Sequence, residues 1–403
     1  MKKFILTLSV LVFSAVTIGA KDPEVTELKY SRNSLYSILV SHTDQKFASE
    51  IQSQFLAIPT PEQYNNHDLS VKVVSVNNNG KYTDAITRFV NQNQIGSRLI
   101  AKWFDRDILT GECSMNLIKE RGIYNASELD KELAKRSTRG IAMLEDAGEE
   151  LIGKTFLLVN EIKYIDKGKR SRLFGNIIQV VGAVAEVATG VQGLSDLGES
   201  VGDLTASLKG FKVKIHTRLY QLVWDEETAN TFYTLYYSSK PDEEKRKAFE
   251  QNRDKFKMKF VGEVESDGST TSFMGINEDE PLLMVRKACQ RAIDDNIADL
   301  QKEYDQFRIK APIVSVEPTI QVQIGLKEGI TKDSKFEVLE AQEKDGRVEY
   351  KRVGIIKPVP SKIWDNRYMA SEEGAYGADF GATTFKKESG KDFYPGLLVR
   401  QIE

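Results

Sequence analysis

An eight-residue segment matches the phosphate-loop pattern, but its surroundings argue against nucleotide binding. Residues 148–155 read Gly-Glu-Glu-Leu-Ile-Gly-Lys-Thr, which fits G-x-x-x-x-G-K-[ST]. A phosphate loop leaves a strand and opens a helix, because the helix N-terminus and its N–H groups bind the phosphates. Here a helical pattern precedes the segment, a strand pattern follows it, and Glu149 and Glu150 would repel an anion. We interpret the segment as a helix C-terminus that is ended by glycines, and we expect no nucleotide ligand.

Histidine and cysteine spacing gives no metal or nucleophile motif. His42, His67 and His216 are scattered and do not form H-x-x-x-H or H-E-x-x-H, so we expect no zinc. No G-x-S-x-G elbow is present. Cys113 and Cys289 are far apart in the sequence, and two interpretations stay open, a disulfide or two buried free thiols.

Carboxylates offer the remaining route to catalysis. Asp294-Asp295 and the 278–280 cluster (Glu-Asp-Glu) supply acidic groups. The second cluster precedes Pro281 and is explained by the electrostatics of a helix start. Paired acids of a glycosidase cannot be asserted from such residues. We therefore predict a protein without enzymatic activity or cofactor, and keep a secreted carboxylate-dependent hydrolase as the alternative.

The first half of the chain alternates strand and helix patterns around these residues. Strands are predicted at 34–42, 71–76 and 155–165. Helices are predicted at 46–56, from Thr83 through Ile100, and at 115–119, 126–135 and 139–152.

The second half is predicted to continue with strands and helices up to a linker at 309–312 and to contain short strands beyond it. Strands are expected at 212–224, 231–237 and 256–264, with a helix at 242–252, and a long apolar stripe predicts a helix from Pro281 to Tyr304. Residues 309–312 suggest a linker. Beyond it, strands are predicted at 313–316, 320–324, 335–340, 348–356 and 397–402, with a hairpin turn at 344–346.

These patterns predict an α+β protein with a central sheet, flanking helices and an appended small β-barrel or sandwich. We assign residues 1–20 to a signal peptide, 21–310 to the α+β body and 311–403 to the β domain. Lys2, Lys3, the apolar run 4–18 and the small pair Gly19-Ala20 are typical of an export signal cleaved near Ala20. An uncleaved anchor is the alternative, although the run is short for a membrane span. We expect an exported protein, periplasmic or associated with the outer membrane.

Length and composition fit that organisation. A chain of 403 residues with 40% hydrophobic and 29% charged residues is typical of a globular protein of two or three domains. Its formal net charge of −3 disfavours a general nucleic-acid binder, which needs a basic face.

The stretch 167–210 is the most unusual part of the sequence. Between Leu173 and Ser195 only Glu186 is charged, and the apolar positions follow helical spacing that Gly190 and Gly193 interrupt. We predict an inserted apolar helical segment whose exposed face would include Phe174, Ile177, Ile178, Val181, Val184 and Val191. Packing within the chain, a subunit interface and contact with a membrane surface are the three alternatives.

The order of these elements resembles the curli secretion channel family, over residues 130–305. Residues 156–165 resemble the strand before its first membrane insertion, and residues 167–210 occupy the position of that insertion. The run from Arg218 to Trp224 (Arg-Leu-Tyr-Gln-Leu-Val-Trp) is similar to its R-L-x-x-(V/D)-x-T-G strand. Residues 260–304 resemble its closing strand, loop and long helix. The insert here has a helical rather than a β-hairpin pattern, and the lipidated cysteine is missing, so pore formation is not carried over.

The tail resembles the small β domain of the flagellar assembly protein T family. There a G-x-x-x-G-x-x-x-(G/D)-x-F-x-V phrase joins two strands, and Gly325, Gly329 and Phe336 carry it here. Both resemblances imply envelope assembly or scaffolding through protein partners or self-association, and neither implies a ligand.

Overall fold

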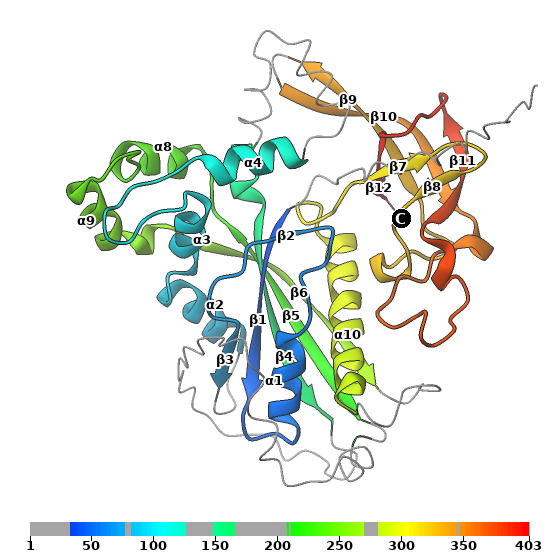
Figure 1. Ribbon diagram of the computed structural model, residues 1–403, viewed down its shortest axis with the longest axis horizontal. Coiled ribbons are helices and arrows are strands. Elements are labelled where there is room, and N and C mark those ends of the chain that lie inside the picture. The colour runs from blue at the N-terminus through cyan, green and yellow to red at the C-terminus, as the bar shows by residue number, and fades with distance from the viewer. Residues whose placement is uncertain are drawn as a thin grey trace, which may run out of the picture.

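The computed structural model describes residues 33–76, 82–125, 148–165, 208, 211–269, 281–344 and 347–402. The protein is α+β, with a mixed sheet and its helices in the body (residues 33–310) and a closed barrel built from residues 311–402 (Figure 1). Apart from Leu208, the predicted apolar insert over 173–208 lies outside the described residues.

The body alternates strands and helices along the chain. Its elements are β1 (Ser34–His42), α1 (Ala48–Leu56), β2 (Asn65–Asn66), β3 (Val73–Val76), α2 (Tyr82–Gln92), α3 (Ile95–Trp103), α4 (Asn116–Asn125), β4 (Thr155–Tyr164), β5 (Lys212–Leu222), α8 (Glu226–Leu235), α9 (Glu243–Gln251), β6 (Met258–Ser269) and α10 (Pro281–Glu303). Short 3-10 turns at Ile152–Lys154 and Arg253–Lys255 precede β4 and β6.

The body sheet has the order β2-β1-β4-β5-β6, and β3 pairs with β1 beyond β2. β1 runs parallel to β4 from Ser34↔Thr155 to Val40↔Glu161, whereas β4–β5 and β5–β6 are antiparallel. The centre of β1 and β4 is apolar on both faces, as expected for strands that are covered on two sides.

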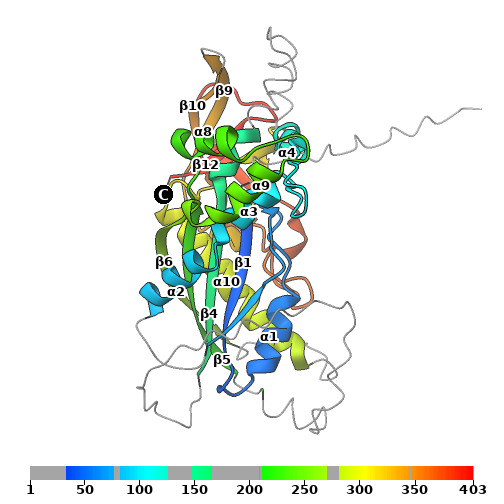
Figure 2. The same ribbon diagram turned by 90° about the vertical axis from the view of Figure 1, so that its left-hand side faces the viewer.

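Two hydrophobic clusters occupy opposite faces of this sheet. One unites sheet residues such as Leu157, Val159 and Tyr220 with side chains of α2, α3, α4, α8 and α9. The other unites Leu158, Ile215 and Leu219 with α1 and α10. In Figures 1 and 2, α2 and α3 lie on one side of the sheet and α10 on the other.

α10 packs closely against β6. A Cβ atom at Gly268 would lie 2.2 Å from the backbone oxygen of Ala288, so only glycine allows this approach. Nearby, Ser266 Oγ donates to the carbonyl of Ala292 at 2.7 Å. The contact keeps α10 along the sheet and beside the barrel.

The C-terminal strands close into a six-membered barrel within the described residues. They are β7 (Ala311–Ser315), β8 (Ile320–Val322), β9 (Phe336–Lys344), β10 (Arg347–Pro358), β11 (Thr383–Gly390) and β12 (Leu398–Gln401), in the order β10-β11-β8-β7-β12-β9 with β9 returning to β10. Their side chains form a third, separate hydrophobic cluster that includes Val322, Val338 and Ile356. The predicted choice between barrel and sandwich is therefore decided in favour of the barrel.

The structure corrects several predicted elements. The strand predicted at 231–237 is wrong, because these residues belong to helix α8 and its C-terminal cap. The single helix predicted from Thr83 through Ile100 is two helices, α2 and α3, separated at Gln94, which has φ 53°. β11 was not predicted at all, and the linker expected at 309–312 already contains the start of β7. The helices predicted at 126–135 and over most of 139–152 lie outside the described residues.

Candidate functional site

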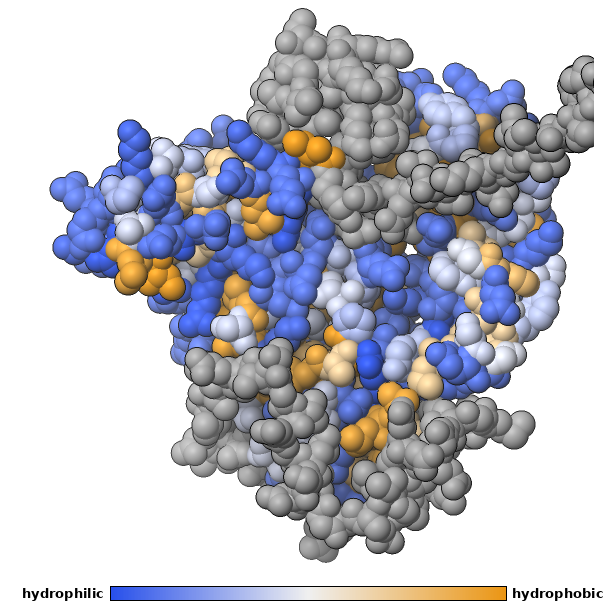
Figure 3. Space-filling view, in the orientation of Figure 1, coloured by the Kyte–Doolittle hydropathy of each residue, from blue (hydrophilic) through white to orange (hydrophobic). Residues whose placement is uncertain are grey.

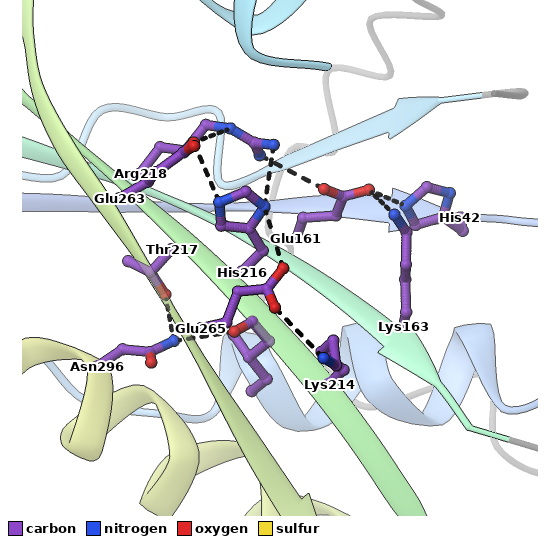
Figure 4. A network of polar contacts seen from close by, with 11 residues as sticks. His42, Glu161, Lys163, Lys214, His216, Thr217, Arg218, Glu263, Glu265 and Asn296 are labelled. Atoms are coloured by element: carbon purple, nitrogen blue, oxygen red, sulfur yellow. Dashed lines mark hydrogen bonds and ion pairs between the residues drawn. The ribbon is translucent and has the colours of Figure 1, made fainter. Parts of the chain in front are cut away.

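A charged sheet face covers one end of the strands β4, β5 and β6 (Figure 4). We define it by eight residues: His42, Glu161, Lys163, Lys214, His216, Arg218, Glu263 and Glu265. The register places them in adjacent rows, because Glu161 pairs with His216, His216 with Glu265, and Arg218 with Glu263. Alternate residues of one strand point to one face, so the charges share the face that further along carries Val159 and Tyr220.

Glu161 is the buried centre of this face. Only 2% of its surface is exposed. Its Oε1 lies 2.8 Å from His42 Nε2 and 2.7 Å from Lys163 Nζ, and its Oε2 lies 3.4 Å from Arg218 Nη1. Burial by itself would raise the pKa of this carboxyl, but the hydrogen bond from His42 and the charge and hydrogen bond of Lys163 lower it to about 2. Glu161 is therefore ionised at neutral pH.

His216 lies between the guanidinium of Arg218 and the carboxylate of Glu263, which hold it as a neutral imidazole. Arg218 Nη2 lies 3.1 Å from its Nδ1, and Glu263 Oε2 lies 3.0 Å from its Nε2. Since arginine can only donate, Nδ1 accepts from Arg218, and Nε2 carries the hydrogen and donates a hydrogen bond to the Glu263 carboxylate. Burial and the charge of Arg218 lower the pKa of His216 in spite of the nearby glutamates. The arrangement fixes the ring rather than preparing it for proton transfer.

The outer part of the charged sheet face is open to solvent. The side chains of Lys214 and Glu265 are 49% and 51% exposed and pair at 3.3 Å. Over the whole face, three permanent cations oppose three carboxylates, so the face is close to neutral. Such a face favours binding of a surface with mixed charges over steering of one strongly charged ligand.

On the opposite side of the sheet, buried polar groups link the strands to α10. Asn160 donates to Ser37 Oγ at 2.9 Å and accepts from Thr217 at 2.9 Å. Asn296 of α10 donates to Thr217 Oγ1 at 2.8 Å, as Figure 4 shows. These hydrogen bonds cross from β1 through β4 and β5 to the helix. They fix the register of α10 on the sheet, although the Oδ1 atom of Asn296 has no hydrogen-bond partner within the described residues.

The charged sheet face was missed by the sequence analysis, although the sequence contains its signal. Basic residues alternate along β5 at 212, 214, 216 and 218, and acidic residues alternate along β6 at 263, 265 and 267. Two such strands, when neighbours, place opposite charges side by side. The sequence alone does not show that β5 and β6 pair in this register.

The histidines and cysteines lie apart. His67 is buried, stacks on Trp103 with a ring-centroid distance of 4.9 Å and accepts from Arg121. Burial and the Arg121 charge lower its pKa to about 3. Cys113 and Cys289 are buried free thiols in the two clusters on opposite faces of the sheet, so the disulfide alternative is wrong. In the described part of the chain, no cluster of three or more histidine, cysteine or acidic side chains could hold a metal ion.

The phosphate-loop look-alike has the order of elements predicted for it. Residues 148–150 are helical, and the 3-10 turn at Ile152–Lys154 leads into strand β4. Gly148 is required for packing, since a Cβ there would lie 2.1 Å from the backbone oxygen of Ile118.

The acidic candidates are not brought together as a catalytic pair. Asp294 is buried in α10 and lines a pocket of about 30 Å³, whereas Asp295 is exposed. A space of that size holds about one water molecule and no sugar ring. The cluster 278–280 lies outside the described residues, as do Phe174, Ile177, Ile178, Val181, Val184 and Val191 of the predicted interaction face.

An exposed apolar turn stands out elsewhere on the body. Ile108 and Leu109 are 78% and 82% exposed. Asp107 Oδ1 accepts from the backbone N–H groups of Leu109 at 2.8 Å and Thr110 at 2.7 Å, and Thr110 O accepts from the N–H of Asp242 at 3.0 Å. These bonds fix the turn against the start of α9. In Figure 3, an orange patch interrupts the hydrophilic surface of the lobe around α8 and α9.

Comparison with known proteins adds no relative. Neither the protein-family models nor the curated proteins contain a match to this chain. None of the helices in the described ranges combines the length and apolar composition needed to cross a membrane.

Proposed function

We propose that this is an exported, non-enzymatic envelope protein that acts in scaffolding or assembly at the outer membrane through contacts with other proteins. The observation that supports it is the turn with Ile108 and Leu109 at its tip. Soluble proteins expose single aliphatic side chains freely, but two adjacent ones on a turn fixed by hydrogen bonds form a preorganised contact point.

The charged sheet face supports the same proposal. Its carboxylates and bases neutralise one another, and Glu161 has hydrogen-bond or ion-pair partners on both oxygens. A general acid needs a pKa near the working pH, whereas the pKa of Glu161 is about 2. Asp294 has a pKa of about 7, but the pocket that it lines holds about one water molecule, and this small size disfavours the hydrolase alternative.

Photocrosslinking in the producing bacterium tests the proposal. Benzoylphenylalanine is placed at Leu109 of the full chain, and at Lys386, an exposed residue of barrel strand β11, as the matched control. We expect a discrete adduct in the envelope fraction from position 109 and none from position 386. Equal labelling at both positions, or no adduct at 109, would contradict the proposal.

A mass measurement separates self-association from a foreign partner. The purified chain is measured by light scattering with and without detergent, for the wild type and for Ile108→Ser with Leu109→Ser. A mass above the monomer that falls in the double variant identifies a second copy as the partner. A monomeric wild type that still forms the adduct in cells identifies a different protein.

A further inference from the structure

A polar cleft of about 420 Å³ separates the body from the barrel. Glu62 and Gln63 of the body line one side, and Lys327, Glu328 and the loop 364–378 of the barrel line the other. Figure 3 shows the surface hollowed between these two parts. The volume lies in the range of small-molecule sites, which occur preferentially between domains.

The barrel side of the cleft is preorganised. The Trp364 indole donates to the carbonyl of Ala378 at 3.0 Å, which closes the loop on itself. Asn366 accepts from the N–H of Lys327 at 2.9 Å and donates to Glu328 Oε2 at 2.7 Å. These bonds hold the lining in place before any ligand binds, which lowers the entropic cost of binding.

Acidic groups outnumber basic ones in the cleft. The charges of Asp365 and Arg367 cancel, because the guanidinium of Arg367 contacts both carboxylate oxygens of Asp365, at 2.8 and 2.7 Å. Among the lining residues, Glu62, Glu328 and Glu372 then face one cation, Lys327, and Glu372 also interacts with the ammonium of Lys287 in α10. Burial raises the pKa of Glu328 even though Asn366, Lys327 and the N–H of Gly325 favour its charged form.

α10 brings both acidic and basic side chains near the cleft, since Asp294 and Asp295 lie on the same helix as Lys287 and Arg291. Burial raises the pKa of Asp294 to about 7, and the charge of Glu328 raises it further, whereas the charge of Lys327 lowers it. The partial desolvation of its carboxyl group and the charge of Asp299 also raise the pKa of Asp295, although the residue is exposed. The excess of acidic over basic groups is therefore that of the residues that line the cleft.

The lining also offers an uncommitted polar group and an apolar wall. Gln63 is 6% exposed, lines the cleft and makes no side-chain hydrogen bond in the described part of the chain. Ile309, Ile324 and Trp364 contribute apolar surface. This combination suits a cationic head that is carried on a short apolar stem.

We propose that this cleft binds an ammonium or guanidinium group on an aliphatic stem, as found in a lysine or arginine side chain of a polypeptide or in a free polyamine. Glu62 and Glu372 lie on either side of the cation, Gln63 hydrogen-bonds it, and Trp364 contacts the stem. The inference is independent of the contact proposed at Ile108 and Leu109.

Fluorine NMR on the full chain labelled with 5-fluorotryptophan tests this site. The chain has three tryptophans, and Trp364→Phe assigns the cleft resonance. We expect acetyl-Ala-Arg-Ala-amide or spermidine to shift the Trp364 signal saturably, while Trp103 and Trp224, which lie in the body core, stay unchanged. Tighter binding of the peptide indicates a polypeptide source, and tighter binding of spermidine indicates a free amine. Acetyl-Ala-Glu-Ala-amide is the anionic control.

Two charge-neutralising variants locate the cation. Glu62→Gln combined with Glu372→Gln removes exposed carboxylates on both sides of the cleft and should raise Kd at least fivefold without loss of folding. Asp254→Asn removes an exposed acid near β6 and should leave Kd within twofold. The inference is overturned if neither cation shifts Trp364, if the anionic peptide binds as well, or if the double variant binds like the wild type.

Discussion

Arg291 of α10 and Glu373 of the barrel loop form an ion pair in which Nη2 and Oε2 are 2.7 Å apart. The same arginine donates to the carbonyl of Tyr368 at 3.0 and 2.8 Å, and Lys287, which is 3% exposed, pairs with the same glutamate. One carboxylate thus joins two cations of the body helix to the barrel.

Removal of that carboxylate should weaken the docking of the barrel. Glu373→Gln leaves the two cations in a partly buried site, which we expect to cost about 2 kcal/mol of unfolding free energy. Urea denaturation at pH 7 measures the loss. Lys287→Met in the same background should restore part of it, because the uncompensated ammonium is gone. Asp379→Asn, at an exposed position of the same loop, is the neutral control.

The low pKa of Glu161 predicts that the stability of the protein depends on pH. Its pKa is about 2 in the folded protein and 4.5 in the reference state, so its contribution is present above pH 4.5 and is lost as the pH falls toward 2. We expect Glu161→Gln to cost about 3 kcal/mol at pH 7 and progressively less below pH 4.5. A variant that is equally destabilised at pH 7 and pH 2.5 would show that the loss comes from packing instead.

Much of the fold could be predicted from local patterns. The apolar runs of β1 and β4 and the stripe of α10 dominate their segments, and these elements lie where expected. The strand expected at 231–237 is a helix instead, because the capping signal prevailed. Asp225 accepts from the N–H of Thr228 at 2.8 Å, and Phe232 and Tyr236 are buried at helical spacing.

Elements that depend on distant partners could not be predicted. Five of the eight residues of β11 are exposed, three of them charged, and the segment forms a strand because β10 and β8 pair with it on its two sides. The cleft likewise combines Glu62 and Gln63 with residues 323–328 and 364–378. No local spacing brings segments that are about 300 residues apart to one site.

Asp294 should show the opposite pH dependence to Glu161. Burial raises its pKa from 3.8 to about 7, and its Oδ2 has no hydrogen-bond partner in the described chain. Its protonated form is therefore favoured in the folded state, and stability is lost as the pH rises from 3.8 toward 7. Asp294→Asn should raise the melting temperature at pH 8 and change it little at pH 4. An equal change at both pH values would contradict this assignment.

The phosphate-loop look-alike predicts opposite outcomes for its glycine and its lysine. Lys154 is partly exposed, so Lys154→Ala should change the unfolding free energy by less than about 0.5 kcal/mol. Gly148→Ala places a methyl group against the carbonyl of Ile118 and should cost about 1–3 kcal/mol. Urea denaturation compares the two variants.

In a functional phosphate loop the lysine would matter most, and magnesium-dependent ATP binding, measured by calorimetry, would be lost in Lys154→Ala. We expect no such binding in the wild type, because a strand follows Lys154 where a phosphate loop requires a helix.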